Sequence, residues 1–261
     1  MLSKYLKPLV VAFLFTLSST VAIFSVLLFL LVFEFERFDF SKGKEFFGDN
    51  VLQLLSPYLG IIAILGALIA VVGARVMNMT DFKHSFDCKG VDWKRSWIPL
   101  TGAVFYIVVL GAFVNVIGLT DIATANSYAV TRSFLGAAAL CVICPVCEEL
   151  VFREAIIRYM LAKGATELQV IFFSSFCFAI AHVTLPRVFF AFFAGLVLAA
   201  LYVKTRNIVL SSVVHIINNT VGVVCMYQCG VDYQLPLVYS IAILILLPYP
   251  TYILLRKFLS F

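Results

Sequence analysis

Charged residues are scarce in this sequence. Asp, Glu, Lys and Arg together make up 13% of the 261 residues, whereas they make up about 25% of an ordinary soluble domain. Hydrophobic residues account for 63% of the chain, which is well above the share in a soluble domain. These proportions exclude a soluble globular protein and predict an integral membrane protein.

The sequence also lacks the features of several other classes. It has no basic patch with interleaved aromatic residues, and its net charge of +5 is spread over the loops between hydrophobic runs. Lys and Arg in such loops set membrane orientation and contact lipid headgroups, so we expect membrane lipids, and no nucleic acid, as partners. The absence of a fixed-period repeat disfavours a transporter built from inverted repeats. Without a long linker, residues 1–261 are expected to form a single integral membrane domain.

Long hydrophobic runs are abundant instead. A membrane-spanning helix needs about 20 predominantly apolar residues, and eight runs approach this length. The sequence therefore predicts an all-α membrane protein, a bundle of about eight transmembrane helices. Alternate loops carry an excess of Lys and Arg, which predicts a cytoplasmic N-terminus and a cytoplasmic C-terminus. The eight runs cover residues 9–33, 51–77, 97–119, 133–162, 168–185, 187–203, 207–226 and 235–255.

Three short polar strings occur inside these runs in the second half of the chain. An ionisable side chain at membrane depth is costly unless it has a partner or faces a wet cavity, so such residues are functional candidates. The chain has three histidines, and two of them belong to these strings. The strings are Glu148-Glu149-x-x-x-Arg153, Phe178-x-x-x-His182 and His215-x-x-x-Asn219.

Helical spacing separates the two glutamates. Glu149 and Arg153 stand four residues apart and share a helix face, so we expect them to form an ion pair. Glu148 points about 100° away from that face and is left unpaired. An unpaired carboxylate in a site of low dielectric is suited to act as a general base.

The other two strings supply hydrogen-bonding groups. His215 and Asn219 share one face of a helix, where they would either stabilise the oxyanion of a tetrahedral intermediate or form a structural network between helices. Asn218 lies on a different face and is interpreted as a packing residue. Phe178 precedes His182 by one helical turn and either forms a wall of the site or packs in the core.

The three motifs together resemble those of a known family. EELVFR at 148–153, FAIAH at 178–182 and HIINN at 215–219 are similar to the motifs of the CAAX protease and bacteriocin-processing family of intramembrane endopeptidases, also called the Abi family. The resemblance covers roughly residues 132–226, which we take as the catalytic core. It implies hydrolysis of a peptide bond within the membrane.

The resemblance also implies a role for each motif residue. Glu148 would activate the water molecule with help from His182, and His215 and Asn219 would form the oxyanion hole. Glu149 and Arg153 would orient the first glutamate. The implied catalytic residues are therefore Glu148, His182, His215 and Asn219, with support from Glu149, Arg153 and Phe178.

A metal ion is an open alternative. His182, His215 and Glu148 satisfy the ligand count of a catalytic Zn²⁺ site, and the family was long described as metalloproteases. However, the chain has no His-Glu-x-x-His pair, and Asn is a poor ligand for zinc. We therefore expect a glutamate protease that needs no cofactor, with a zinc-dependent metalloprotease as the alternative.

Two further classes use similar residues. An ion-coupled transporter also places Glu, His and Arg at membrane depth, and a non-catalytic immunity or scaffold relative would keep the fold. The intact motifs favour an enzyme, a hydrolase. Its expected substrate is a membrane-associated or lipidated peptide, or a leader or signalling peptide. Compact loops and the lack of targeting signals favour a multi-pass protein of the bacterial cytoplasmic membrane.

Seven cysteines form an odd-numbered set, and Cys141-x-x-Cys144-Pro-Val-Cys147 superficially matches redox and metal spacings. Three of them lie in the apolar run before the glutamates, where cysteine behaves as a small hydrophobic residue. We therefore expect neither a redox nor a metal function, nor a disulfide. The cysteines are at positions 88, 141, 144, 147, 177, 225 and 229.

Overall fold

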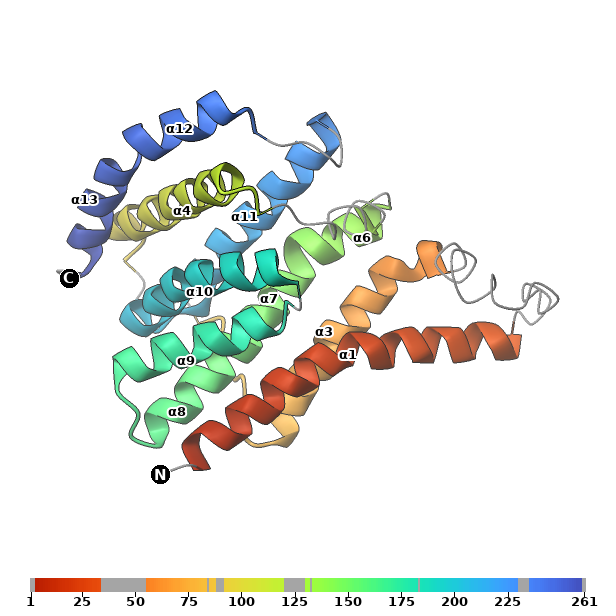
Figure 1. Cartoon of the computed structure of the whole chain (residues 1–261). Helices are drawn as coiled ribbons and strands as arrows, with labels where there is room; N and C mark the ends of the chain where they lie inside the picture. The colour runs from red at the N-terminus through yellow and green to blue at the C-terminus, as the bar shows by residue number, and fades with distance from the viewer. Residues whose placement is uncertain are drawn as a thin grey trace.

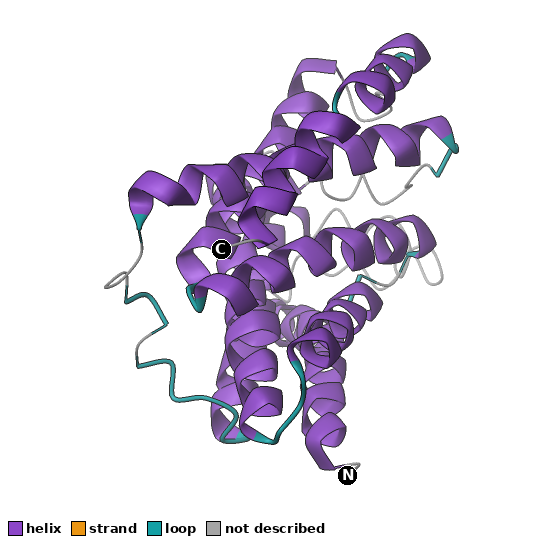
Figure 2. Ribbon diagram, turned by 90° about the vertical axis from the view of Figure 1, so that its left-hand side faces the viewer, coloured by secondary structure: helices purple, strands orange, loops and turns teal. Residues whose placement is uncertain are grey.

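All regular secondary structure in the described part of the chain is helical (Figure 2). The computed structural model describes residues 3–33, 55–83, 85–87, 92–119, 130–131, 133–182, 184–229 and 235–259. The all-α prediction is confirmed for these residues. Cys88 lies outside them, as does the predicted loop 34–50.

In the described part of the chain, six helices are long and apolar enough to cross a membrane. A helix suits this task because every backbone N–H and C=O is bonded within the segment, and lipid offers no other partner. A short 3₁₀ turn, η3 (Ser56–Tyr58), precedes the second helix. Five of the six are α1 (Ser3–Phe33), α3 (Leu59–Val76), α4 (Trp93–Val116), α10 (Leu185–Thr205) and α11 (Ile208–Cys229).

The sixth spanning helix is a composite rod between Phe134 and Ala162 that runs through the middle of the molecule (Figure 1). It confirms the long helix predicted over 133–162, and it contacts α3, α9, α10 and α11. Two of its stretches are π-helical, with wider turns than an α-helix. Its parts are α6 (Phe134–Ala138), the π-helical η4 (Ala139–Ile143), α7 (Cys144–Glu149), the π-helical η5 (Leu150–Ile157) and α8 (Arg158–Ala162).

The prediction of eight full spans is not confirmed. The run at 168–185 forms α9 (Glu167–Ile180), which has 14 residues and therefore rises about 21 Å, less than the hydrocarbon core of about 30 Å. The last run is α12 (Leu237–Leu246) followed by α13 (Pro248–Leu259), bent by 42°. Counting that pair as one span gives seven in the described part of the chain.

Neighbouring helices pack as antiparallel pairs around the central rod. Figure 1 shows α1 beside α3 and α9 beside α10, and both pairs are in contact. On α10, Gly195 permits the close approach of α9, because a Cβ atom there would lie 3.2 Å from the Cβ of Ser175. On the other side of the molecule, α4 contacts α10, α12 and α13.

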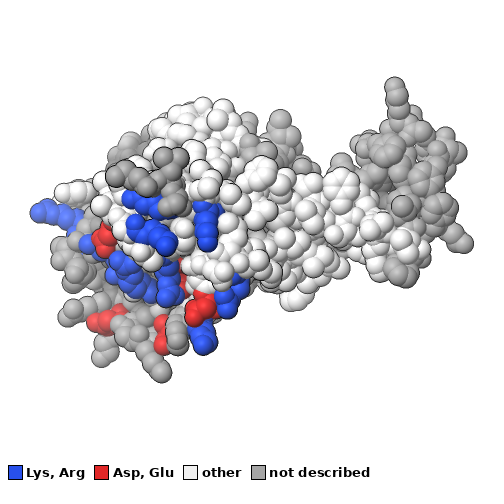
Figure 3. Space-filling view, turned by 90° about the horizontal axis from the view of Figure 1, so that it is seen from below, with Lys and Arg blue, Asp and Glu red and all other residues white. Residues whose placement is uncertain are grey.

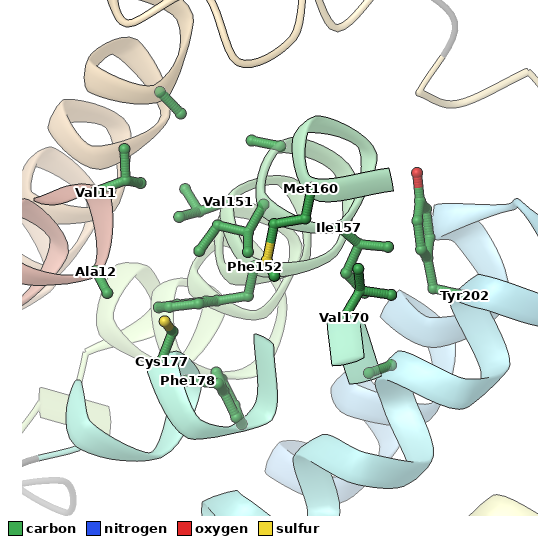
Figure 4. Close-up of a cluster of buried hydrophobic side chains, with 14 of the residues drawn as sticks. Val11, Ala12, Val151, Phe152, Ile157, Met160, Val170, Cys177, Phe178 and Tyr202 are labelled. Atoms are coloured by element: carbon green, nitrogen blue, oxygen red, sulfur yellow. The ribbon is translucent and has the colours of Figure 1, made fainter. Parts of the chain in front are cut away.

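A buried apolar cluster joins the rod to α9, α1 and α10 (Figure 4). The rings of Phe152 and Phe178 meet edge to face with centroids 5.3 Å apart. Glu154 is also buried here, because it accepts a hydrogen bond from the Tyr202 hydroxyl, 2.6 Å away, and pairs with Arg158. This packing fixes the part of the rod that follows the two glutamates.

Lys and Arg side chains gather at one end of the molecule, while the rest of the described surface in this view is nearly free of charge (Figure 3). The first turn of α1, the connection between α8 and α9, and the last turn of α13 lie on this side in Figure 1. Such one-sided charge is typical of membrane proteins. The cytoplasmic location of both termini stays a prediction.

Candidate active site

The three polar strings meet at one cavity of about 650 Å³. Glu148 comes from α7, His182 from the turn after α9, and His215 and Asn219 from α11; all four side chains line the cavity. The candidate residues are thus brought together from three separate elements. Mostly apolar residues of α1, α3, α4 and α10 form the other walls, which also include Arg187.

The short length of α9 explains how His182 reaches this cavity. The helix begins at the Lys and Arg end with a capping box, in which the Thr166 side chain and the Gln169 side chain each bond the other's backbone. It stops after about 21 Å, and His182 lies in the turn that follows. The His182 backbone N–H donates to the Ala179 carbonyl. Non-helical backbone at membrane depth is tolerated where it is buried or lines a cavity, and this turn lines one.

Glu149 and Arg153 form the ion pair that their spacing predicted. Arg153 Nε lies 3.3 Å from Glu149 Oε2, and both side chains are 0% exposed. The guanidinium carbon of Arg153 also lies 4.4 Å from the centre of the Phe178 ring. Because the carboxylate and the guanidinium offset each other, this charge is held in the interior at a lower cost than an isolated ion.

His215 bridges the two glutamates. Its Nδ1 lies 3.0 Å from Glu149 Oε1, and its Nε2 lies 3.5 Å from Glu148 Oε2. An ionised carboxylate accepts but does not donate hydrogen bonds, so Nδ1 carries a proton toward Glu149. The contact of Nε2 with Glu148 is longer than a normal hydrogen bond. The expectation of an unpaired Glu148 is corrected here, since it contacts His215.

This bridge also changes the expected action of the ion pair. The sequence led us to expect that Glu149 and Arg153 orient Glu148. The direct contact of Glu149 is instead with His215, and His215 is the residue that touches Glu148. Glu149 and Arg153 therefore position the imidazole, and the imidazole positions Glu148.

His182 is fixed in a single tautomer by the backbone. Its Nδ1 lies 2.8 Å from the Phe178 carbonyl oxygen, and because a carbonyl only accepts hydrogen bonds, Nδ1 is the protonated nitrogen. Nε2 is then the nitrogen that can accept a proton. The Phe178 ring meets the rings of both His182 and His215 edge to face, at 4.6 Å and 5.6 Å between centroids. Phe178 is therefore a wall of the site and a contact for both imidazoles.

Asn219 is held by an irregularity in the central rod. In the π-helical turn η4, the Cys144 N–H bonds the Ala139 carbonyl, so the next donor in that pattern would be residue 145. Pro145 has no N–H, which leaves the Leu140 carbonyl without a partner in its own helix. The Asn219 side-chain amide donates to this carbonyl at 3.0 Å.

Asn218 is a member of the site that the sequence interpretation missed. We placed it among the packing residues because it lies on a different face of its helix. It lines the cavity, and its amide donates to Asn219 Oδ1 at 3.0 Å. The adjacent Asn-Asn pair was the available signal, because a cavity wider than one helix face accepts side chains from neighbouring positions.

The described cysteines agree with a packing role. Cys147 and Cys177 are buried, and Cys141 and Cys144 are partly buried, and all four are free thiols. Cys144 also lines the cavity. Cys225 is free and exposed, while nothing is described for the side chain of Cys229.

The side chains that the zinc alternative would use, Glu148, His182 and His215, line one cavity. In the described part of the chain, no three His, Cys, Asp or Glu side chains are grouped so as to hold a metal ion. One ring nitrogen of His215 is bonded to Glu149, and one of His182 is bonded to a carbonyl. Metal-bound histidines also hold their other ring nitrogen in this way, so the mechanism without a cofactor stays a prediction.

A comparison with known families identifies the segment that carries the site. Residues 129–221 match the family model described as Rce1-like, type II CAAX prenyl endopeptidase Rce1-like. The matched segment contains every polar cavity residue described above and excludes α1, α3, α4, α12 and α13. No curated protein and no solved structure matches this chain.

Proposed function

We propose that this multi-pass membrane protein is an intramembrane endopeptidase that uses a glutamate-activated water molecule. The match of residues 129–221 to the family model of Rce1-like type II CAAX prenyl endopeptidases supports the proposal. One observation carries the mechanism. Glu148, His182, His215 and Asn219 come from three elements and line a single cavity. Peptide-bond hydrolysis needs a base, a water molecule and an oxyanion donor within reach of one carbonyl.

The base in this proposal is Glu148. It has a partly accessible side chain, 15% exposed, beside the fully buried Glu149. Glu148 removes a proton from water, and the resulting hydroxide adds to the carbonyl carbon of the substrate. His182 accepts a hydrogen bond from the same water through Nε2, which orients the attack. The proton taken up by Glu148 then passes to the departing amine when the C–N bond breaks.

The oxyanion donors in this proposal are His215 and Asn219. Glu149 holds the Nδ1–H of His215. In the proposal His215 also carries a proton on Nε2, which faces Glu148 at rest and donates to the oxyanion once Glu148 has taken up a proton from water. Asn219 uses one amide hydrogen on the Leu140 carbonyl and keeps a second for the substrate. Donors fixed before the reaction stabilise developing charge without reorganisation, and removing one such donor costs about 10² to 10³ in kcat.

The cavity favours an apolar peptide as substrate. Its volume of about 650 Å³ lies within the range of about 300 to 1,000 Å³ of ligand pockets. Its walls include Phe15, Ile107 and Phe190, which suit hydrophobic side chains or part of a lipid group. We therefore propose a membrane-associated or lipidated peptide, or a leader or signalling peptide, as substrate.

The proposed setting is the bacterial cytoplasmic membrane, with the Lys and Arg end in the cytoplasm. In this orientation α9 enters from the cytoplasmic side and ends at His182. The substrate would approach from the cytoplasm or the inner leaflet, since this is the side from which the short helix leads to the cavity. No cofactor is part of the proposed mechanism.

The Glu148→Gln substitution tests the proposed base. We expect this variant to lose proteolysis by at least about 10³-fold, because an amide cannot take up the proton, while membrane insertion is unchanged. Peptidomics of membranes with wild-type or variant protein measures both the activity and the substrate. The matched control is Glu167→Gln, because Glu167 forms an exposed ion pair with Arg206 away from the cavity.

Two results would overturn this proposal. Appreciable cleavage by Glu148→Gln would reject Glu148 as the base. Loss of wild-type activity after exhaustive chelation, with recovery on adding Zn²⁺, would establish the zinc-dependent alternative instead. Full activity after chelation is the expected result, measured on the purified protein together with its metal content.

A further inference from the structure

A second hollow of about 590 Å³ lies at the Lys and Arg end of the molecule. It is formed by the start of α1, the end of α3 with the turn that follows, and α8. It shares no lining residue with the active-site cavity. We call it the basic hollow and define it by Lys7, Arg75, Asp81, Arg158, Tyr159 and Lys163.

The basic hollow carries an excess of positive charge. Four of its defining side chains are cations, and Asp81 is the acidic residue among them. The pKa of Asp81 is lowered, chiefly because the Lys83 backbone N–H donates to its carboxylate, so this carboxylate is charged at neutral pH. Arg158 pairs with Glu154. After the carboxylates of Asp81 and Glu154 are subtracted from the four cations, a net charge of two positive units remains.

The cations are brought together by the fold. Lys7 Nζ donates to the Met77 carbonyl at the end of α3, 3.1 Å away, which joins α1 to α3. The centroid of the Tyr159 ring lies 5.6 Å from Lys7 Nζ and 5.9 Å from Lys163 Nζ. Both ammonium groups therefore contact the same ring. Arg75 and Lys163 pair with no carboxylate of the described residues. Cations that line one hollow are stabilised by an anion with several oxygens.

The surroundings of the hollow favour a lipid as the source of that anion. Exposed apolar side chains stand beside the cations on the same helices: Leu6, next to Lys7, is 63% exposed, and Val76, next to Arg75, is 73% exposed. Such helix faces are covered by acyl chains in a membrane. Basic pockets between helices on the cytoplasmic side are suited to phosphate-bearing lipid headgroups.

We propose that the basic hollow binds a phosphate group, held by Arg75 and Lys163 with Lys7 behind them. A lipid headgroup and a soluble phosphate share this chemistry, and the apolar borders favour the phosphate of an anionic phospholipid. The site lies apart from the catalytic residues. Its occupancy would tie α1, α3 and α8 together at the membrane surface.

Native mass spectrometry of the full chain in detergent tests the site. The probes are phosphatidylglycerol, phosphatidylcholine as the lipid without net charge, and inorganic phosphate. We expect phosphatidylglycerol to bind on the order of tenfold more tightly than phosphatidylcholine. The double variant Arg75→Gln/Lys163→Gln should lose that preference, because each surface cation contributes roughly a few-fold in affinity for an anionic lipid.

Two further variants keep the test decisive. Lys204→Gln/Arg256→Gln removes two exposed cations outside the hollow and should keep the preference. Arg75→Lys/Lys163→Arg conserves charge and should keep it as well, which separates loss of charge from misfolding. Binding of inorganic phosphate without a preference for phosphatidylglycerol would assign the site to a soluble phosphate. The proposal would be overturned if both charge-removing variants lost the preference for phosphatidylglycerol equally. It would also be overturned if neither phosphatidylglycerol nor inorganic phosphate bound.

Discussion

At the scale of single residues, the site depends on how two buried charges are partnered. The sequence predicted the Glu149 and Arg153 pair because both residues belong to one helix, and local spacing determines such contacts. It did not predict that His215 lies between Glu148 and Glu149. That contact joins residues 66 positions apart, and only the packing of α7 against α11 brings them together.

The buried pair gives a prediction about stability. Arg153→Met should destabilise the protein by about 3 to 5 kcal/mol, because it leaves the Glu149 carboxylate buried without its charge partner. The double variant Glu149→Gln/Arg153→Met should recover much of this loss, since no uncompensated charge remains. Thermal unfolding of the purified variants measures the coupling. The control is the same double-mutant cycle at Glu154 and Arg158. Its coupling free energy should be below about 1 kcal/mol, because Arg158 is 49% exposed. Additive effects at Glu149 and Arg153 would contradict this account.

At the scale of elements, two irregular helices shape the site. The short length of α9 places His182 at the active-site cavity, and the π-helical turn η4 presents the Leu140 carbonyl to Asn219. Hydrophobic runs predict where helices exist, yet they do not mark where α9 ends, because apolar residues continue through Ala181 and Leu185. Pro145 indicated an irregularity in the rod, but a π-turn also depends on the neighbouring α11, which supplies the missing donor.

Pro145→Ala tests the role of this irregularity. An N–H at position 145 would bond the Leu140 carbonyl, so Asn219 would lose its fixed orientation. We expect proteolysis to fall by about tenfold or more, while the melting temperature stays equal or rises, because a proline inside a helix is costly. The control is Pro99→Ala, which removes a helix-internal proline from α4 and should leave activity unchanged. A parallel fall in activity and melting temperature would indicate general unfolding instead.

At the scale of the whole molecule, the positions of charge and of the helix ends favour one orientation in the membrane. The α9 and α10 pair begins and ends at the Lys and Arg end (Figures 1 and 3), so the chain returns to the same side whether or not α9 crosses fully. The sequence predicted cytoplasmic termini from its loops, which stays a prediction, and its eight full spans are not confirmed because α9 is shorter than its apolar run. Depth in the membrane depends on helix length, which composition alone does not determine.

Reporter fusions test this orientation. A fluorescent protein that folds in the cytoplasm should be active at both the N-terminus and the C-terminus, and a phosphatase that is active outside the cytoplasm should be inactive at both. The physical reason is the Lys and Arg excess at the end that holds the first turn of α1 and the last turn of α13. Opposite signals at the two termini would contradict the orientation and would favour an odd number of crossings.

The walls of the active-site cavity come from two sources. The reacting groups belong to the segment 129–221, whereas Phe15, Ala63 and Ile107 belong to helices that precede it. Substitutions in α1 and α3 can therefore change which peptide the proposed enzyme accepts without changing the proposed reacting groups. Exchanging α1 and α3 with those of another protein that matches the same family model would then transfer preference for a peptide, while the reaction of the recipient is retained.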